Sequence, residues 1–295
     1  MRFKGQHQYR IMIRLNSLQI NICLLSMIFI MGLQSFSSVA QNKTIQIVQI
    51  SDPQFGFFDE NKSFVKETML NAEAIRQINK LKPDFVVVTG DFVNNSKDVN
   101  QIEEFKRITA GLDEDIPLYL SPGNHDLGQN PTKKDFEFYF SQYGKGNDRF
   151  AFEYNDSYFI GLNSVMIKSK TNKREEKKQL RWLKRKLKQA KSADMIIVFT
   201  HYPFFINDFD EIENYSNQSK KDRLKYFNLF EKYGVDAIYA GHLHNNAESS
   251  HNGIMMITTN AAGRPLGKAE PGYRLIKIVD GVINSDYISI DPKDI

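Results

Sequence analysis

The sequence of 295 residues contains one cysteine, Cys23, which lies near the amino terminus. Residues 24–295 therefore contain no cysteine that could form a disulfide bond and no thiolate for nucleophilic catalysis. Zinc sites built on cysteine are excluded there for the same reason. Any metal ion bound by this part of the chain must be held by Asp, Glu, Asn, Gln or His.

Acidic residues are absent from residues 1–40, which contain four basic residues, Arg2, Lys4, Arg10 and Arg14. These four account for the whole formal net charge of +4, so residues 41–295 are electrically balanced. A balanced chain is not expected to bind nucleic acid or a membrane surface as a polycation. Hydrophobic residues at 41% and charged residues at 25% are typical of a globular protein.

Residues 1–40 also have the order of a targeting segment. An apolar stretch at 22–33 follows the basic residues and is too short for a typical membrane-spanning helix. The small residues Ser38 and Ala40 come next, as at a signal-peptide cleavage site. We predict that residues 1–40 are a signal peptide, cleaved after Ala40, and that the protein is secreted or periplasmic. A membrane anchor in this segment is the alternative.

Several common catalytic motifs are missing. The sequence has no G-x-S-x-G, no G-x-x-x-x-G-K-[ST] and no H-E-x-x-H. The run Gly144-Lys145-Gly146 lacks the third glycine and the preceding strand of a dinucleotide-binding loop. Serine hydrolases of that type, P-loop enzymes and zincins are therefore disfavoured.

Apolar runs typical of buried strands alternate with segments of helical period. We predict strands at 45–50, 85–89, 118–120, 195–200 and 237–240, and helices near 64–81, 98–111, 132–143, 174–191 and 219–233. Hairpin-like patterns occur at 150–154 with 158–162, and at 254–259, 273–279 and 282–290. The order indicates an α/β fold with two mixed sheets in one domain, at about 43–290.

Polar side chains follow five of the predicted strands, at the point where each strand ends. The motifs are Asp52-Pro53-Gln54, Gly90-Asp91, Gly123-Asn124-His125-Asp126, Thr200-His201 and Gly241-His242-Leu243-His244. Sites in open α/β sheets form beyond the carboxyl ends of strands, so these motifs are expected to converge. The purely structural alternative needs five separate buried polar clusters, each costly unless paired. Two carboxylates with amides and imidazoles suit two divalent cations that share a bridging carboxylate.

The remaining two histidines are not part of this set. His7 lies in the predicted leader, and His251-Asn252-Gly253 is typical of a hairpin turn.

The ordered motifs resemble those of the calcineurin-like metallophosphoesterases, and the resemblance covers residues 43–290. Within this superfamily, DPQFG, GNHDLGQNPT and GHLHNNA are most similar to the group named calcineurin-like phosphoesterase domain-containing protein 1. The resemblance implies a four-layer αββα sandwich with a metal site at one edge of the two sheets. It also implies a phosphoester hydrolase in which a metal-bridging hydroxide attacks phosphorus in line, without a covalent enzyme intermediate.

The same resemblance assigns roles to individual residues. One metal ion is expected on Asp52, Gln54, Asp91 and His244, and a second on Asp91, Asn124, His201 and His242. Asp91 then bridges the two divalent ions, which are Mn, Fe, Zn or Mg. His125 is expected to remain unligated and to stabilise the transition state or protonate the leaving group.

Two positions depart from the broader pattern. Gln54 stands where the first motif usually has a histidine, and its amide oxygen is a harder ligand that favours Mn or Mg and weakens site one. After Asp91, the name-giving Ser/Thr phosphatases have GDxVDRG, but this chain has Asn94 and Asn95 in place of the Asp and Arg. Asn94 can orient His125 but cannot offset a positive imidazolium.

We therefore predict hydrolysis of phosphomonoesters, either on a small phosphorylated molecule or on a phosphoprotein. A phosphodiesterase acting on nucleotides or lipid head groups is one alternative, and a non-catalytic module that binds metal or phosphate is another. Nothing in the sequence specifically indicates nucleic-acid binding, and membrane contact is expected only through an uncleaved leader.

Four loops are expected to lie over the site, at 55–63, 127–135, 204–218 and 260–272. An apolar rim there could be formed by Phe55, Phe57, Phe58, Phe204 and Phe205, unless these residues pack in the core. Arg264 either reaches a bound phosphate or is an ordinary surface arginine. Residues 168–191 contain twelve basic and two acidic residues, which indicates a solvated helix face or a surface for an anionic partner.

Overall fold

Eleven strands form two mixed sheets in the computed structural model, which describes residues 44–169 and 171–290. The first sheet has the order β11-β10-β1-β2-β3 and the second the order β4-β5-β6-β7-β9-β8. Strands β1 to β3 are parallel, as are β5, β6, β7 and β9, while antiparallel strands complete each sheet. The first-sheet strands are β1 (Thr44–Ile50), β2 (Phe85–Val88), β3 (Leu118–Leu120), β10 (Gly272–Val279) and β11 (Val282–Ser289). The second-sheet strands are β4 (Phe150–Tyr154), β5 (Ser157–Leu162), β6 (Met195–Thr200), β7 (Ala237–Ala240), β8 (Ala247–His251) and β9 (Ile254–Thr258).

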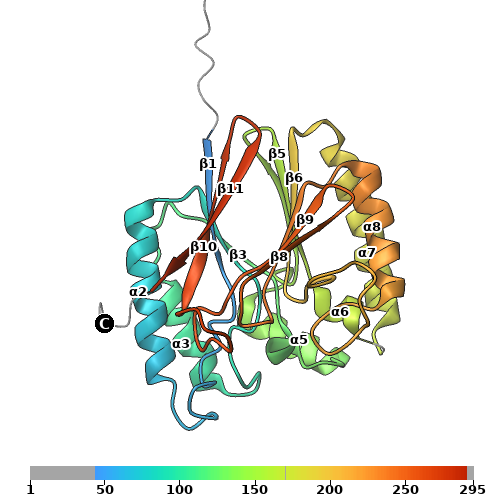
Figure 1. The fold of residues 1–295 in the computed structure, drawn as a ribbon. Coiled ribbons are helices and arrows are strands. Elements are labelled where there is room, and N and C mark those ends of the chain that lie inside the picture. Colours follow the sequence, from blue (N-terminus) through green and yellow to red (C-terminus); the bar gives the residue numbers. More distant parts are fainter. Residues whose placement is uncertain (1–43, 170, 291–295) are drawn as a thin grey trace, which may run out of the picture. The chain divides into compact units, whose positions relative to one another are not determined.

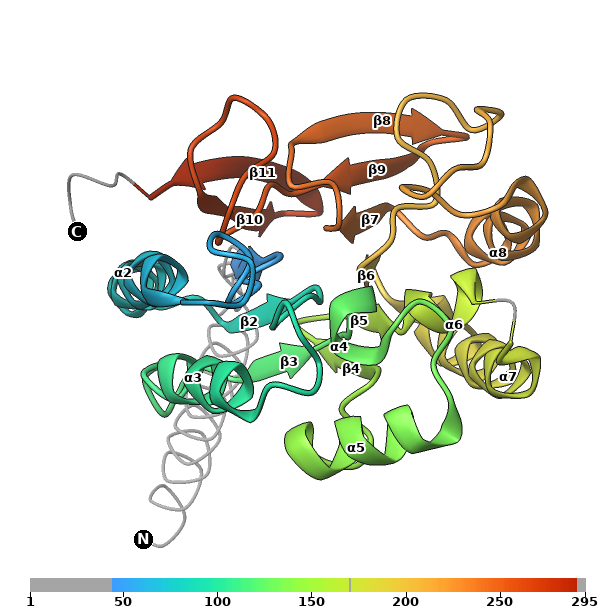
Figure 2. The same ribbon diagram turned by 90° about the horizontal axis from the view of Figure 1, so that it is seen from below.

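Central strands are buried on both faces, which explains their continuous apolar sequences. In β2, Val86 and Val88 face the helices α2 (Val65–Leu81) and α3 (Val99–Thr109) in one core cluster. Phe85 and Val87 face the second sheet in another cluster, where the rings of Phe85 and Phe159 lie 4.9 Å apart. On the far side, α7 (Lys173–Gln189) and α8 (Lys220–Tyr233) cover the second sheet. The described domain is the expected four-layer αββα sandwich (Figures 1 and 2).

The five predicted helices form within a few residues of their expected positions, whereas two short helices of four and five residues were not predicted. The Asp98 side chain caps α3 by accepting the amide hydrogens of Asn100 and Gln101. In α7, Leu183 and Leu187 are fully buried while the basic residues face outward. The remaining helices are α4 (Asn124–Leu127), α5 (Lys133–Tyr143), α6 (Ser164–Lys168) and a 3-10 turn at Ala190–Ser192.

The last three strands form within one residue of the predicted ranges and β10 pairs with β11 as a hairpin, but β9 is not part of their sheet. The stretch after residue 254 divides between the two sheets, since β9 pairs with β7 and β8 whereas β10 pairs with β1. Strand β8 was not expected, because its sequence AESSH is polar and it forms an edge with alternating exposure. The predicted turn at His251 is confirmed: His251 pairs with Ile254, which leaves Asn252 and Gly253 at φ 49° and 83°.

The predicted signal peptide and its cleavage after Ala40 lie outside the described residues. Within the described residues, which make up one compact unit, we find no helix with the length and apolarity needed to cross a membrane.

Candidate metal centre

The structure brings together the eight side chains predicted from the strand-end motifs. Asp52 and Gln54 follow β1, Asp91 follows β2, and Asn124 and His125 begin α4 after β3. From the second sheet, His201 follows β6, and His242 and His244 follow β7. All except His125 are buried, although each is polar or ionisable. Such a concentration of buried polar groups is costly unless they are hydrogen-bonded, charge-paired or bound to a ligand, and it is typical of functional sites.

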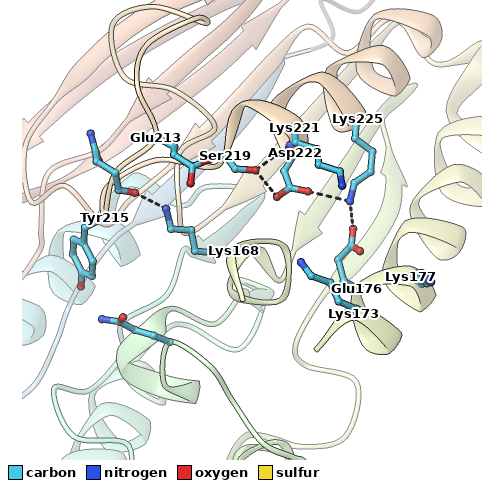
Figure 3. Close-up of a pocket in the computed structure, with 12 residues that line it drawn as sticks. Lys168, Lys173, Glu176, Lys177, Glu213, Tyr215, Ser219, Lys221, Asp222 and Lys225 are labelled. Atoms are coloured by element: carbon cyan, nitrogen blue, oxygen red, sulfur yellow. Dashed lines mark hydrogen bonds and ion pairs between the residues drawn. The ribbon is translucent and has the colours of Figure 1, made fainter. Parts of the chain in front are cut away.

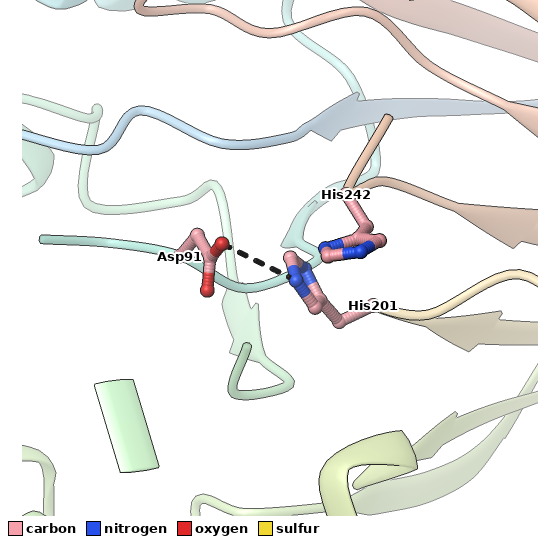
Figure 4. A group of neighbouring side chains, drawn as sticks. All are labelled: Asp91, His201 and His242. Atoms are coloured by element: carbon pink, nitrogen blue, oxygen red, sulfur yellow. Dashed lines mark ion pairs between the residues drawn. The ribbon is translucent and has the colours of Figure 1, made fainter. Parts of the chain in front are cut away.

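Two groups of possible metal ligands share one carboxylate. The ligand atoms of Asp91, His201 and His242 lie within 4.8 Å of one another (Figure 4). The ligand atoms of Asp52, Asp91 and His244 form a second group within the same limit. Asp91 is thus the common member, in the position that a bridging ligand requires.

The backbone is left-handed at five of these residues. The values of φ are 49° at Asp52, 40° at Gln54, 50° at Asp91, 71° at His242 and 48° at His244. A non-glycine residue in this region costs about 1–2 kcal/mol. Strain that recurs at five neighbouring residues of the predicted centre is typical of a functional site rather than of chain packing.

Glycines permit the close approach of the loops. A Cβ atom on Gly123 would lie 2.1 Å from Oδ1 of Asp91, and one on Gly241 would lie 1.8 Å from Oγ of Ser51. Neither distance is compatible with a side chain at these positions. The two glycines therefore allow the loops after β3 and β7 to pack directly against the carboxylates.

Backbone carbonyl groups orient the histidine rings. Nδ1 of His201 donates to the carbonyl of Thr89 at 2.9 Å, and Nδ1 of His244 donates to that of Arg264 at 2.6 Å. A carbonyl group only accepts, so Nδ1 carries the hydrogen, and Nε2 of His201 faces two other predicted ligands, Oδ1 of Asn124 at 3.1 Å and Oδ2 of Asp91 at 3.3 Å. Nδ1 of His125 is bound in the same way by the carbonyl of Asn94 at 2.8 Å.

Three buried atoms at the centre have no hydrogen-bond partner among the described residues: Oδ1 of Asp52, Oε1 of Gln54 and Nε2 of His242. Buried polar atoms are almost always paired in native proteins. These three belong to three different predicted ligands and have free lone pairs. The side chains therefore fit divalent cations, which would satisfy all three atoms at once.

The charges at the centre perturb one another. Burial by itself would lower the pKa of His201, but the nearby Asp91 and Asp52 carboxylates raise it to about 9. Burial by itself would raise the pKa of Asp91, but the positive charge of His201 3.3 Å away lowers it. Burial and the charge of His201 lower the pKa of His242 to about 3, so this imidazole is neutral and able to coordinate.

Asp126 supports the centre, a role that the sequence analysis did not assign. Its Oδ1 accepts the amide hydrogen of Phe92 at 2.8 Å, and its Oδ2 accepts that of Gly123 at 2.8 Å. The carboxylate thus connects the loop of Asp91 to the loop of Asn124. The position of Asp126 in the GNHD motif indicated that it lies near the centre. The sequence alone does not show whether such a carboxylate binds a metal ion or backbone amide groups.

The structure decides between the alternatives that the sequence left open for the surroundings of the centre. Phe55, Phe204 and Phe205 are fully buried in the core, so they form no apolar rim. Phe57 does reach the centre, since its ring lies 5.2 Å from that of His244. Asn94 orients His125 through its backbone carbonyl, while its side chain accepts from Nε2 of Gln54 at 3.2 Å. Arg264 places its guanidinium 5.4 Å from the centroid of the Phe57 ring, at the margin of the centre.

A family model described as calcineurin-like phosphoesterase matches residues 45–246, which is more than half of the chain and includes all eight side chains. The chain belongs to the calcineurin-like phosphoesterase family. It is therefore a phosphoric ester hydrolase of the metallophosphoesterase type. Members of this family use divalent metal ions, in agreement with the candidate ligand groups and the three unpaired atoms at the centre.

Relatives of this calcineurin-like phosphoesterase support the assignment. The chain is 31% identical over 280 residues to "Serine/threonine-protein phosphatase CPPED1" of Rattus norvegicus, covering 88% of this chain and 89% of the relative. It is 30% identical over 220 residues to "Probable glycerophosphodiester phosphodiesterase GpdQ" of Arcobacter nitrofigilis, covering 72% and 76%. A solved dimetal phosphatase from Danio rerio has the same fold, with a TM-score of 0.59 and 14% identity over 83% of this chain and 98% of that chain.

Proposed function

We propose that this protein is a dinuclear phosphomonoesterase. Site one consists of Asp52, Gln54, Asp91 and His244, and site two of Asp91, Asn124, His201 and His242. The observation that carries the proposal is the shared position of Asp91 in both ligand groups, together with the three unpaired atoms around it. The oxygen-rich composition of site one favours Mn or Mg there, whereas the imidazoles of site two also suit Fe or Zn.

When bound, the cations supply Lewis acidity and a nucleophile at neutral pH. The residues of the chain supply position and a proton. Asp91 is held by the amide hydrogen of His125 at 2.7 Å, so it stays aligned between the two ligand groups. His125 belongs to neither ligand set, and its Nε2 is the ring nitrogen left for the substrate because Nδ1 binds the carbonyl of Asn94. We assign His125 to the protonation of the leaving oxygen.

A phosphomonoester is the preferred substrate because the relatives with the longest alignments are described as protein phosphatases. The phosphomonoester that is hydrolysed belongs either to a small phosphorylated molecule or to a phosphoprotein. A phosphodiesterase is the second candidate, since the Arcobacter relative carries that description over 72% of this chain. The chain lacks the Arg and Asp of the GDxVDRG motif, and Asn94 and Asn95 stand in their place.

Metal analysis combined with an ester panel tests the proposal. Protein loaded with Mn²⁺ should hydrolyse p-nitrophenyl phosphate faster than bis-p-nitrophenyl phosphate, and the reverse order would support the phosphodiesterase. His125→Ala should lower kcat about 100-fold or more while the bound metal stays unchanged. His251→Ala is the matched control, since His251 stacks on Phe209 away from the centre. If loaded protein turns over neither ester yet still binds phosphate after His125→Ala, the protein is a binding module.

We also propose that residues 1–40 direct the protein out of the cytoplasm and are removed after Ala40. The basic, apolar and small-residue order of the segment supports this proposal. Fractionation of cells that express the full chain, with mass determination of the product, tests it. A mature amino terminus at Gln41 is expected, and an uncleaved chain in the membrane fraction would support the anchor.

A further inference from the structure

A cavity of about 730 Å³ lies between α7, α8 and the loop that precedes α8 (Figure 3). None of its lining residues is one of the eight side chains of the metal centre.

The cavity has a positive balance, with five lysines and three acidic residues in its lining. Two of the three carboxylates already have partners inside the protein. Lys225 places Nζ 2.6 Å from Glu176 and 3.1 Å from Asp222, as the dashed lines in Figure 3 show. Ser219 donates its hydroxyl to Asp222 as well.

Two of the lysines remain available to a ligand. Within the described part of the chain, no carboxylate pairs with Lys177 or Lys221, and both side chains are exposed. They approach the cavity from different helices, Lys177 from α7 and Lys221 from α8. A ligand between the helices would therefore meet two ammonium groups without an ion-pair partner, together with one carboxylate of the lining, that of Glu213.

Tyr215 connects this cavity to the metal centre. It lines the cavity, and its ring lies 4.8 Å from the ring of His242. Its hydroxyl accepts from Nδ2 of Asn124 at 3.4 Å. Lys168 holds the same loop by donating from Nζ to the carbonyls of Asn214 and Asn217. Tyr215, which is partly exposed, therefore stands between the cavity and a substrate bound at Asn124 and His242, the two predicted metal ligands that it contacts.

We propose that this cavity is an anion subsite that binds an acidic side chain next to the phosphorylated residue of a phosphopeptide substrate. The inference rests on the proposed phosphomonoesterase function and deepens it by naming the substrate class. A carboxylate and a second phosphoryl group have the required chemistry in common, because both accept hydrogen bonds from lysine ammonium groups. Binding energy gained there is remote from the reacting phosphoryl group, so it lowers KM more than it changes kcat.

Matched phosphopeptides test the subsite. Each of the three peptides carries one phosphoserine. Within about four positions on either side of it, the first peptide has Gln, the second has Glu and the third has a phosphonate amino acid that is not hydrolysed. We expect a KM about three- to tenfold lower for the Glu peptide than for the Gln peptide, as for two exposed ion pairs. The phosphonate peptide then tells whether a carboxylate or a phosphoryl group binds better. The preference should fall with added salt, since exposed charges are screened.

The double variant Lys177→Gln/Lys221→Gln should lose the preference for the Glu and phosphonate peptides. Its turnover of p-nitrophenyl phosphate should equal that of the unmodified protein, because that ester has no flanking group. Lys184→Gln is the control, since Lys184 is exposed on α7 but does not line the cavity. This control should retain the full preference.

Three results would overturn the subsite: equal KM values for the Gln, Glu and phosphonate peptides, a preference that survives in the double variant, or an equal loss in Lys184→Gln. The last would assign the effect to the general charge of α7. Failure of the proposed function looks different, because p-nitrophenyl phosphate would then not be hydrolysed by the unmodified protein.

Discussion

The hydroxyl group of Ser51 donates a hydrogen bond of 2.5 Å to Oδ2 of Asp52, which leaves Oδ1 of that carboxylate free for the metal centre. This contact is the last of a buried chain in which each group donates toward the carboxylate. Nε of Arg274 donates to the hydroxyl of Thr259 at 3.0 Å, and this hydroxyl donates to the side-chain oxygen of Gln49 at 2.6 Å. The side-chain nitrogen of Gln49 donates to the hydroxyl of Thr89 at 2.9 Å, which in turn donates to Ser51 at 3.1 Å. A buried arginine thus connects to a predicted ligand through polarised hydrogen bonds.

We expect Gln49→Leu to interrupt this chain and weaken metal binding about tenfold. The hydroxyls of Thr259 and Thr89 lose a partner, so the free energy of unfolding should also fall by about 2 kcal/mol. Metal titration and urea denaturation measure the two effects. Gln46→Leu is the control on the same strand, because Gln46 is half-buried and donates to the carbonyl of Leu81 instead. Unchanged metal affinity in Gln49→Leu would contradict a positioning role for the chain.

Gly123→Ala should abolish metal binding and also destabilise the fold, since the added Cβ would lie 2.4 Å from the backbone nitrogen of Asp91. The new methyl group would lie 2.1 Å from Oδ1 of Asp91, so the carboxylate must turn away from the amide hydrogen of His125. We expect metal content below a tenth of normal and kcat/KM reduced at least about 100-fold. Gly111→Ala is the comparison, since its nearest neighbour is the carbonyl of Ile108 at 3.1 Å, outside the centre. Normal metal content in Gly123→Ala would show that the loop adapts.

The convergence of the centre could be predicted from the sequence because its residues stand at strand ends. Asp52 and Asp91 follow parallel neighbours, so they must share an edge of the first sheet. The matching edge of the second sheet supplies His201 and His242. Burial of β1 and β2 on both faces makes those strands easy to recognise from their apolar residues.

Other features depend on contacts between distant segments and have no local signal. The left-handed backbone at Gln54 is supported by the amide hydrogen that it donates to the carbonyl of Asp91, 37 positions later. Phe204 and Phe205 follow a motif of the centre, yet they turn into the core beside α8. The basic sequence of α7 indicated a possible surface for an anionic partner, but nothing in the sequence of α8 showed that Lys221 would line the same cavity.

Gln54→His should increase metal retention. Gln54 offers Oε1, since its Nε2 donates to the side chain of Asn94 at 3.2 Å. A neutral amide oxygen is a weaker ligand for transition metals than an imidazole nitrogen. After identical dialysis of Mn- or Zn-loaded protein, elemental analysis should find more metal per chain in the variant, while Gln54→Leu should hold less than the unmodified protein. Equal metal content in all three proteins would contradict the assignment of Gln54 as a ligand.

Asp135 should stabilise the domain in a pH-dependent manner, independently of the metal centre. Lys97 donates to Oδ1 at 2.9 Å, and the amide and hydroxyl of Thr132 donate to Oδ2 at 2.9 and 2.7 Å. The ammonium of Lys97, followed by the Thr132 bonds, lowers the pKa of this carboxyl from 3.8 to about 2. A lowered pKa in the folded state means that the stabilisation is complete above pH about 4 and is lost as the pH falls through about 2.

Asp135→Asn should therefore reduce the free energy of unfolding at pH 7 by about 1 kcal/mol, less than the pKa change alone implies because solvent screens the pair. Urea denaturation should show the full difference at pH 7 and a smaller one at pH 3, since protonation removes the advantage from the unmodified protein as well. Glu137→Gln on the same helix is the control, because Glu137 and Lys133 form an exposed pair at 3.2 Å that should contribute less than about 0.5 kcal/mol. A difference for Asp135→Asn that stays constant between pH 7 and pH 3 would mean that the capping geometry, and not the carboxylate charge, stabilises the start of α5.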